Sequence, residues 1–396
     1  MASILEIAKK LNKEYKDDNL SIISNIKPVY NRLVTNAFGL DYILGGGPVL
    51  GRIIELSGVE HSGKTTAACV IIAAYQRAFP DKYCAYFDVE HTLDLKFQAR
   101  MTGLNLDKLI YVSPNNLSGE QICDMILEYQ KADDIGAIAL DSLPALIPSA
   151  VMENDLTKDP GMRGTMAKVY HKFFPEMNDL VARKENLFIA INQVRDAGKT
   201  FTGVQLYKEP CGSAPAYYSS YILRFGKRKF TLGDDMDACG AKNGEGSDGF
   251  RLSFKPIKNK CGNCNRGGGF MTFRYKTGFD WINDLLEIAL SFGFIHRVNN
   301  VTYELIDLET GEMYTDEDGD LLRGKKNDLV EYIKTNVSFQ TKYLAMLNRY
   351  ISQDETKSYG QLLDERANAE IDEQQDAINH QYDADRMTEQ PAQQGA

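Results

Sequence analysis

Hydrophobic residues between positions 36 and about 278 come in short apolar runs that alternate with longer amphipathic segments. Short apolar runs with polar ends are typical of buried strands, and segments such as 118–131 and 163–184 have helical spacing. This alternation predicts an α/β domain with a mainly parallel central sheet covered on both faces by helices. The expected strands are 52–57, 83–88, 109–112, 136–141 and 187–192, followed by the β-rich runs 220–226, 249–256 and 269–275.

Three further segments flank this domain. Residues 1–35 begin with a short amphipathic helix pattern and continue as a loose connector. Residues 279–352 open with helical spacing at 280–290, and a hairpin-like stretch and two helices follow, so we expect a small α+β C-terminal domain. Residues 353–396 are acidic, rich in glutamine and poor in large apolar groups, which predicts a helical extension that ends in a disordered tail.

Composition limits the classes of protein to which the chain can belong. It has 396 residues, of which 43% are hydrophobic, so it can bury a large core. The net charge of −10 does not attract nucleic acid to the molecule as a whole, so a nucleic-acid site must be a local basic patch or an amide-rich surface. No apolar stretch approaches the roughly 20 residues of a membrane span. Seven cysteines, an odd number, in a chain that does not begin with a signal-peptide pattern indicate a reducing compartment, and we expect a cytoplasmic location.

The strongest chemical signal is a glycine followed by four residues and then Gly-Lys-Thr, the pattern of a phosphate-binding loop. Gly58 and Gly63 let the backbone turn its N–H groups towards phosphate oxygens, and the N-terminus of the following helix adds positive potential. Lys64 would reach the β- and γ-phosphates, and the Thr65 hydroxyl would hold Mg²⁺. The alternative is a glycine-rich turn that matches by chance. The predicted nucleotide-binding residues are Gly58, Val59, Glu60, His61, Ser62, Gly63, Lys64, Thr65 and Thr66.

Acidic residues follow two of the predicted strands. Asp141 ends an apolar strand, and at the carboxyl edge of a parallel sheet it would lie beside Thr65 and support Mg²⁺ through water. Asp88 and Glu90 straddle the end of another strand, and a carboxylate near the γ-phosphate can orient and polarise the attacking water. Glu90 is the preferred candidate, whereas an ordinary loop role is the simpler interpretation for Asp88 and His91.

Uncharged amides mark the end of a further strand, at Asn192 and Gln193. An amide at this edge can hydrogen-bond a γ-phosphate or its attacking water, and so distinguish ATP from ADP. A capping role for the next loop is the alternative for Asn192.

In this order the motifs resemble the RecA family of bacterial and phage recombinases. The resemblance runs from about Leu40 to Ile295 and rests on the phosphate loop, FDVEHTLD, ALDSLPALIP, INQVR and then IKNK. It implies a RecA-like phosphate-loop NTPase core that uses ATP and Mg²⁺.

Several residues match functional positions of that family. Glu90 matches the glutamate that activates water, and Gln193 matches the glutamine that senses the γ-phosphate. Phe97 occupies the place of the aromatic residue that stacks on adenine, and Asp94 would lie near the base.

The resemblance also implies contacts between subunits. Lys258 and Lys260 match a lysine pair that reaches the ATP of the neighbouring subunit in the family's filament, which makes hydrolysis depend on assembly. A solvated strand end is the alternative for this pair. The N-terminal helix would dock its apolar stripe on the next subunit's core, or, equally, on its own core.

Two loops of the family bind single-stranded DNA, and they correspond here to about 149–164 and 195–212. Basic groups for phosphates, with aromatic or methionine side chains that wedge between bases, suit sequence-independent binding. Mobile polar loops without a DNA role are the alternative. The candidates are Met152, Lys158, Met162 and Arg163 in the first loop and Arg195, Lys199, Phe201, Tyr207 and Lys208 in the second.

The chain departs from the bacterial pattern at several points, which suggests a divergent, phage-encoded member. Its second loop ends in Cys211-Gly-Ser rather than paired glycines, and an unusual Gly-rich insertion with Cys261 and Cys264 follows IKNK. One CxxC pair supplies two zinc ligands and a structural site needs four, so free thiols are the preferred interpretation.

The function that this set predicts is a DNA-dependent ATPase and homologous recombinase. It would form ATP-dependent filaments on single-stranded DNA and promote pairing and strand exchange with homologous duplex DNA, with single-strand-binding and loader proteins as further partners. The alternatives are a hexameric RecA-like helicase, which would form closed rings, and a recombination mediator that binds ATP with little turnover.

Overall fold

The computed structural model describes Lys10 and residues 31–152, 165–199, 205–208, 210–232, 247–262, 267–291, 295–307, 310–315 and 319–352. Contacts divide the chain into two compact units, Met1–Asn31 and Arg32–Ala396. Within the described ranges, no helix combines the length and the apolar character that crossing a membrane requires. The expected N-terminal helix pattern and the acidic tail lie outside these ranges, apart from Lys10.

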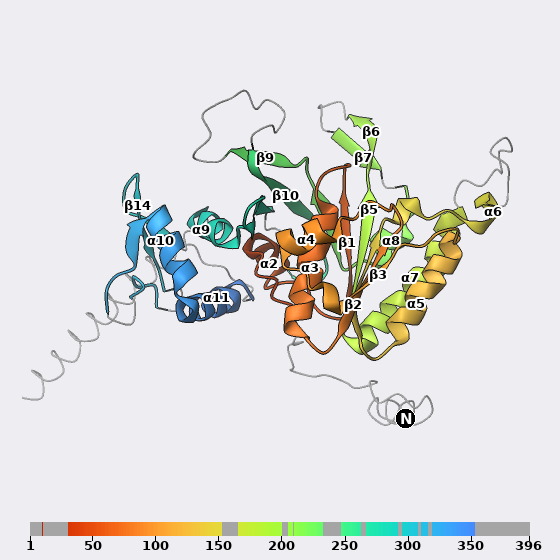
Figure 1. Ribbon diagram of the computed structural model, residues 1–396, viewed down its shortest axis with the longest axis horizontal. Coiled ribbons are helices and arrows are strands. Elements are labelled where there is room, and N and C mark those ends of the chain that lie inside the picture. The colour runs from red at the N-terminus through yellow and green to blue at the C-terminus, as the bar shows by residue number, and fades with distance from the viewer. Residues whose placement is uncertain are drawn as a thin grey trace, which may run out of the picture. The chain divides into compact units, whose positions relative to one another are not determined.

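The second unit is built on a 10-stranded sheet in the order β12-β11-β10-β8-β1-β5-β4-β2-β3, with β9 paired to β10 (Figure 1). The strands from β8 to β3 are parallel, and those beyond β8 are antiparallel, so the sheet is mainly parallel as predicted. The parallel strands are β1 Arg52–Gly58, β2 Tyr83–Asp88, β3 Leu109–Val112, β4 Ile135–Asp141, β5 Leu187–Gln193 and β8 Tyr221–Phe225. The antiparallel strands are β9 Lys229–Leu232, β10 Ser247–Asn259, β11 Gly269–Arg274 and β12 Gly278–Phe279.

Helices cover both faces of the parallel strands (Figure 1). Successive side chains of a strand point to opposite faces, so Ala137 and Ala139 of β4 join one buried cluster, and Ile138 and Leu140 join another. The first face carries α2 Phe38–Leu44, α3 Lys64–Ala78 and α4 Leu95–Thr102, and the second carries α5 Gly119–Lys131, α7 Thr165–Lys184 and α8 Ala214–Tyr218.

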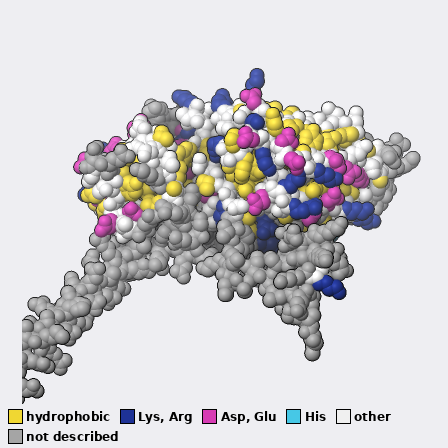
Figure 2. Space-filling model, turned by 90° about the horizontal axis from the view of Figure 1, so that it is seen from below, with side chains coloured by type: hydrophobic (Ala, Val, Ile, Leu, Met, Phe, Trp, Pro, Cys, Tyr) yellow, Lys and Arg dark blue, Asp and Glu magenta, His cyan; other side chains and the backbone are white. Residues whose placement is uncertain are grey.

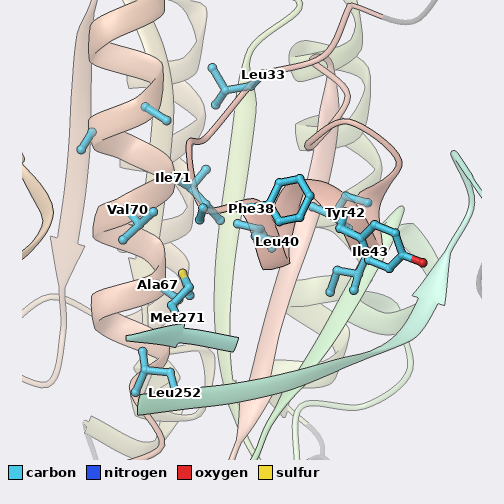
Figure 3. Close-up of a cluster of buried hydrophobic side chains, with 14 of the residues drawn as sticks. Leu33, Phe38, Leu40, Tyr42, Ile43, Ala67, Val70, Ile71, Leu252 and Met271 are labelled. Atoms are coloured by element: carbon cyan, nitrogen blue, oxygen red, sulfur yellow. The ribbon is translucent and has the colours of Figure 1, made fainter. Parts of the chain in front are cut away.

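The core on the first face joins segments that are far apart in the sequence, and its burial fixes α3 against the sheet (Figure 3). Because α3 follows the phosphate loop directly, this packing also fixes one end of the loop. The labelled members include Phe38, Leu40 and Ile43 of α2, Ala67, Val70 and Ile71 of α3, Leu252 of β10 and Met271 of β11.

The elements expected after residue 279 are present. Helix α9, Trp281–Ser291, contacts α2 and β11, and its buried side chains belong to the same cluster as α3. Residues Arg32–Ala396 therefore form one unit by contacts, and the domain boundary at 279 stays a prediction. The remaining elements are β13 Ile295–Arg297, β14 Thr302–Leu305 and β15 Arg323–Lys325, which form a small sheet, and the helices α10 Lys326–Thr335 and α11 Val337–Ser352.

Charges of both signs are distributed over the surface. On the face drawn in Figure 2, the described acidic and basic side chains are interspersed with apolar and neutral ones. A broad field of one sign therefore does not cover this face, and recognition of a charged ligand depends on local groups.

Candidate functional site

The phosphate loop joins β1 to α3, as the sequence predicts. Strand β1 lies between β5 and β8, and all three are parallel, so the loop emerges at the carboxyl edge in the middle of the sheet. Gly63 has a φ of 87°, and a Cβ atom there would lie 2.3 Å from Cδ2 of Leu252. Both the backbone conformation and the close packing therefore require glycine. Helix α3 begins at Lys64, so its unpaired N–H groups lie next to the loop.

Lys64 is held at the base of the loop. Its Nζ donates hydrogen bonds to the carbonyl oxygens of Val59 and Gly58, at 2.8 and 3.3 Å, and to Oγ of Ser62 at 3.4 Å. Burial lowers the pKa of Lys64, while the carboxylates of Asp141, Glu90 and Glu60 raise it. The loop thus presents a cation whose partners are neutral oxygens, which a phosphate can replace.

Thr65 and Asp141 come together as predicted. Oδ2 of Asp141 accepts a hydrogen bond from Oγ1 of Thr65 at 2.8 Å and a second from the Tyr86 hydroxyl at 2.7 Å. Burial raises the pKa of Asp141 to about 6; the two hydroxyl donors lower it, and the charges of Glu90 and Asp88 raise it. Tyr86, on the neighbouring strand β2, was not anticipated from the sequence.

The donor set fits Mg²⁺. A hydroxyl and a carboxylate are hard oxygen ligands, and Mg²⁺ takes one or two such protein groups together with phosphate oxygens and water. Among the described residues, no group of three or more His, Cys, Asp or Glu side chains could hold a metal ion. Two protein oxygens fill only part of the coordination shell of Mg²⁺, so Thr65 and Asp141 suit a metal that is shared with a bound phosphate.

Glu90 is held by two donors, one at the end of β5 and one just after β4. Its Oε1 accepts a hydrogen bond of 2.7 Å from Nε2 of Gln193 and another from Oγ of Ser142. Gln193 ends β5, and Ser142 follows the last residue of β4, so the ends of β2, β4 and β5 converge on one carboxylate. Ser142 was missed as a site residue, although its position directly after Asp141 was a signal for it.

These groups line one cavity of about 360 Å³. Ten predicted residues belong to its lining, and Thr92, Leu93, Gln98 and Arg228 are additions that the sequence did not indicate. A second cavity, of about 440 Å³, lies between α5 and α7 and shares no lining residue with the first. The lining of the first is Glu60, His61, Ser62, Gly63, Lys64, Thr65, Glu90, Thr92, Leu93, Asp94, Gln98, Asp141, Gln193 and Arg228.

The two residues predicted to lie near the adenine ring, Asp94 and Phe97, differ in their placement. Asp94 lines the cavity and caps α4, where its side chain accepts a 2.9 Å hydrogen bond from the backbone N–H of Phe97. Phe97 is half-buried against the core, with the guanidinium group of Arg100 over its ring. It is not among the residues that line the cavity. Stacking of Phe97 on adenine stays a prediction.

Asp88 stabilises the turn that follows β2, in keeping with the loop role that the sequence favours as the simpler interpretation. It is fully buried, and its carboxylate accepts hydrogen bonds from the backbone N–H groups of Thr92 and Leu93 and from the Tyr111 hydroxyl. These contacts fix the turn that carries Glu90 into the cavity. Thr66 is also buried and accepts a hydrogen bond from Gln98 at 3.4 Å.

Lys258 and Lys260 lie together outside the cavity lining of their own chain. Nζ of Lys258 donates to the carbonyl oxygens of Ala216 and Tyr217, and Nζ of Lys260 donates to that of Tyr217 at 3.2 Å. Burial and the charge of Lys260 lower the pKa of Lys258. The pair is thus anchored at the end of α8, and its action on a neighbouring subunit stays a prediction.

The expected DNA loops are described in part. Met152 ends the short helix α6, Ser149–Met152, and is 44% exposed. Arg195 is exposed and begins β6, Arg195–Lys199, which pairs with β7, Gln205–Lys208, as an antiparallel hairpin. The backbones of Lys199, Tyr207 and Lys208 belong to this hairpin. The structure does not describe the side chains of these three residues. Four further candidates lie wholly outside the described residues: Lys158, Met162, Arg163 and Phe201.

The zinc alternative is untested. Cys261 is buried and is not part of a disulfide, while Cys264 lies outside the described residues. The preference for free thiols stays a prediction.

The fold and the loop between β1 and α3 place the chain in the class of phosphate-loop α/β proteins. A family model described as the RecA N-terminal domain matches residues 3–262, and the chain belongs to the RecA family.

Three relatives whose names contain RecA agree with this assignment. Protein RecA of Mycoplasma mobile is 28% identical over 363 residues, which are 90% of this chain and 97% of that protein. Protein RecA of Haemophilus ducreyi is 32% identical over 269 residues, 66% of each chain. The mitochondrial DNA repair protein recA homolog 3 of Arabidopsis thaliana is 29% identical over 331 residues, 83% of this chain and 69% of that one. The crystal structure of the RadB recombinase covers 61% of this chain and 95% of its own, with a TM-score of 0.41 and 20% identity.

Proposed function

We propose that this protein is a DNA-dependent ATPase and homologous recombinase of the cytoplasm. It forms ATP-dependent filaments on single-stranded DNA and promotes pairing and strand exchange with homologous duplex DNA in recombination and repair. The observation that carries the proposal is the convergence of Lys64, Thr65, Asp141, Glu90 and Gln193 on one cavity in a chain of the RecA family.

Each of these residues has a defined chemical task in ATP hydrolysis. Lys64 and the N–H groups at the start of α3 bind the phosphates. Thr65 and Asp141 would hold Mg²⁺, which when bound withdraws charge from the phosphate oxygens. Glu90 orients the attacking water and accepts its proton, because it lines the same cavity and its Oε1 is fixed by two donors. Gln193 hydrogen-bonds either Glu90 or the γ-phosphate, and so reports the state of the nucleotide.

The second loop connects this chemistry to DNA. Gln193 ends β5, and the β6–β7 hairpin follows after a single residue. A movement of the Gln193 side chain or backbone would therefore act directly on the start of this hairpin. With Arg195 exposed at its start, the hairpin supplies a local cation on a chain whose net charge is −10. Lys258 and Lys260 of one subunit complete the site of the next, which makes hydrolysis depend on the filament.

The test is electron microscopy of the protein with single-stranded DNA and a slowly hydrolysed ATP analogue, together with a strand-exchange assay. Open helical filaments and joint molecules are the expected results. Closed rings with unwinding of a forked duplex would replace the proposal with the helicase alternative, and filaments without measurable ATP turnover would replace it with the mediator.

A further inference from the structure

Arg228 belongs to the lining of the nucleotide cavity although it is distant in sequence from every other lining residue. It lies three residues beyond the end of β8, and β8 runs parallel to β1, with Phe225 opposite Gly58. A Cβ atom on Gly58 would lie 2.8 Å from the carbonyl oxygen of Phe225, so the two strand ends are in close contact. The chain that leaves β8 is thereby directed past the phosphate loop.

The side chain of Arg228 is held in place by an aromatic ring. Its Cζ lies 5.0 Å from the ring centroid of Phe250, which is 1% exposed on β10. A guanidinium group over a buried ring is attracted by the ring face. Its N–H groups lie in its own plane, so a guanidinium held in this way can donate sideways to a planar or tetrahedral anion. Arg228 itself is half-buried, which keeps it accessible to a ligand in the cavity.

The described lining of the cavity carries more negative than positive groups, and Arg228 is one of its two permanent cations. Four carboxylates line the cavity, those of Glu60, Glu90, Asp94 and Asp141, whereas its permanent cations among the described residues are Lys64 and Arg228. A nucleoside triphosphate adds several negative charges to this excess. Lys64 and a Mg²⁺ ion at Thr65 and Asp141 would offset part of this charge, and a further cation at the cavity wall would offset more of it.

We propose that Arg228 binds a phosphate group of the nucleotide from within the same chain. The guanidinium fork donates to phosphate oxygens as a charge-assisted pair, and the ring of Phe250 keeps it oriented before the ligand arrives. Its action differs from that of Lys258 and Lys260, because it needs no neighbouring subunit. The inference rests on the proposed nucleotide site and adds one residue to it.

The test is titration of the full-length protein with fluorescent ADP and with a fluorescent, slowly hydrolysed ATP analogue, without DNA and at two salt concentrations. The variants are R228Q and R228K, with K227Q as the matched control, because the adjacent Lys227 is exposed and does not line the cavity. We expect about tenfold weaker binding for R228Q, an intermediate loss for R228K and a change within about twofold for K227Q. Wild-type affinity should also fall more steeply with salt than that of R228Q.

The ligand-induced rise in melting temperature gives a second measurement, which controls for folding. It should be smaller for R228Q than for K227Q at the same ADP concentration. Equal affinities for wild type and R228Q, or equal losses for R228Q and K227Q, would overturn the inference and leave the nucleotide site intact. A wild-type protein that binds neither nucleotide would instead overturn the proposed function.

Discussion

Nε2 of Gln193 donates a 2.7 Å hydrogen bond to Oε1 of Glu90 and so joins the ends of β5 and β2 across β4. The amide that would sense the γ-phosphate is therefore bound directly to the carboxylate that would activate water. Any movement of Gln193 towards a phosphate changes the hydrogen bonding of Glu90. Under the proposed function, this one contact would couple nucleotide sensing to water activation.

Replacing Glu90 with glutamine tests its chemical role at nearly constant size. An amide cannot accept the proton of the attacking water, while its oxygen can still accept from Ser142 and Gln193. We expect kcat for ATP hydrolysis to fall by roughly 10²–10⁴-fold and nucleotide affinity to change little. Steady-state kinetics and nucleotide titration measure the two effects, and turnover near that of wild type would show that Glu90 is not the base.

Ser142→Ala tests whether Ser142 positions Glu90. The change removes one of the two donors to Oε1, and we expect kcat to fall by roughly tenfold at constant KM, because hydrogen bonds to charged groups contribute about 1.5–3 kcal/mol. In the E90Q background the same change should have little further effect on kcat. Additive losses in the double variant would indicate a merely structural role for Ser142.

Mixing two inactive variants tests whether the lysine pair acts on a neighbour. Subunits with K64A retain the lysine pair but have a defective loop, and subunits with Lys258 and Lys260 both changed to alanine have the opposite defect. If the pair acts between subunits, a 1:1 mixture restores roughly one productive interface in four in a head-to-tail filament. DNA-dependent ATPase activity of the mixture measures this, and a mixture as inactive as its components would place the lysines' action elsewhere.

The raised pKa of the buried Asp284 carboxyl group predicts that the stability of the fold depends on pH. Burial raises the pKa of Asp284 to about 7, against weaker lowering by Thr272 and Arg251, and its Oδ1 is buried without a hydrogen-bond partner. The folded state therefore holds a proton that the unfolded state releases from about pH 4 upwards, so stability falls as pH rises from about 4 to 7.

The variant D284N isolates this effect, because its neutral amide resembles the protonated acid. Between pH 5 and pH 8, the melting temperature of wild type should fall by a few degrees more than that of D284N at equal protein concentration. Parallel pH profiles for the two proteins would show that Asp284 does not carry the effect.

The sequence predicted the parallel strands closely because each is a short apolar run with a polar end. Strand β2 has the bounds expected, and the ends of β1, β4 and β5 differ by one residue or none. The same regularity placed Asp141, Glu90 and Gln193 at one edge, since the carboxyl ends of parallel strands converge.

Other features depend on contacts that no local pattern encodes. Arg228 reaches the cavity because β8 pairs with β1, and this pairing is not visible in either strand's sequence. Asp94, which caps α4, lines the cavity, whereas Phe97 in the first turn of α4 packs against the core. Strand β10 is longer than expected because it pairs with β8, β9 and β11 in turn along its length.

The central claim is that this site hydrolyses ATP in response to single-stranded DNA. It is tested most directly by the rate of phosphate release from wild type and K64A, with and without single-stranded DNA. Removing the Lys64 ammonium group takes away the loop's phosphate-binding cation, so we predict DNA-stimulated turnover for wild type and almost none for K64A. A wild-type rate that DNA leaves unchanged, or a K64A rate equal to that of wild type, would contradict the account.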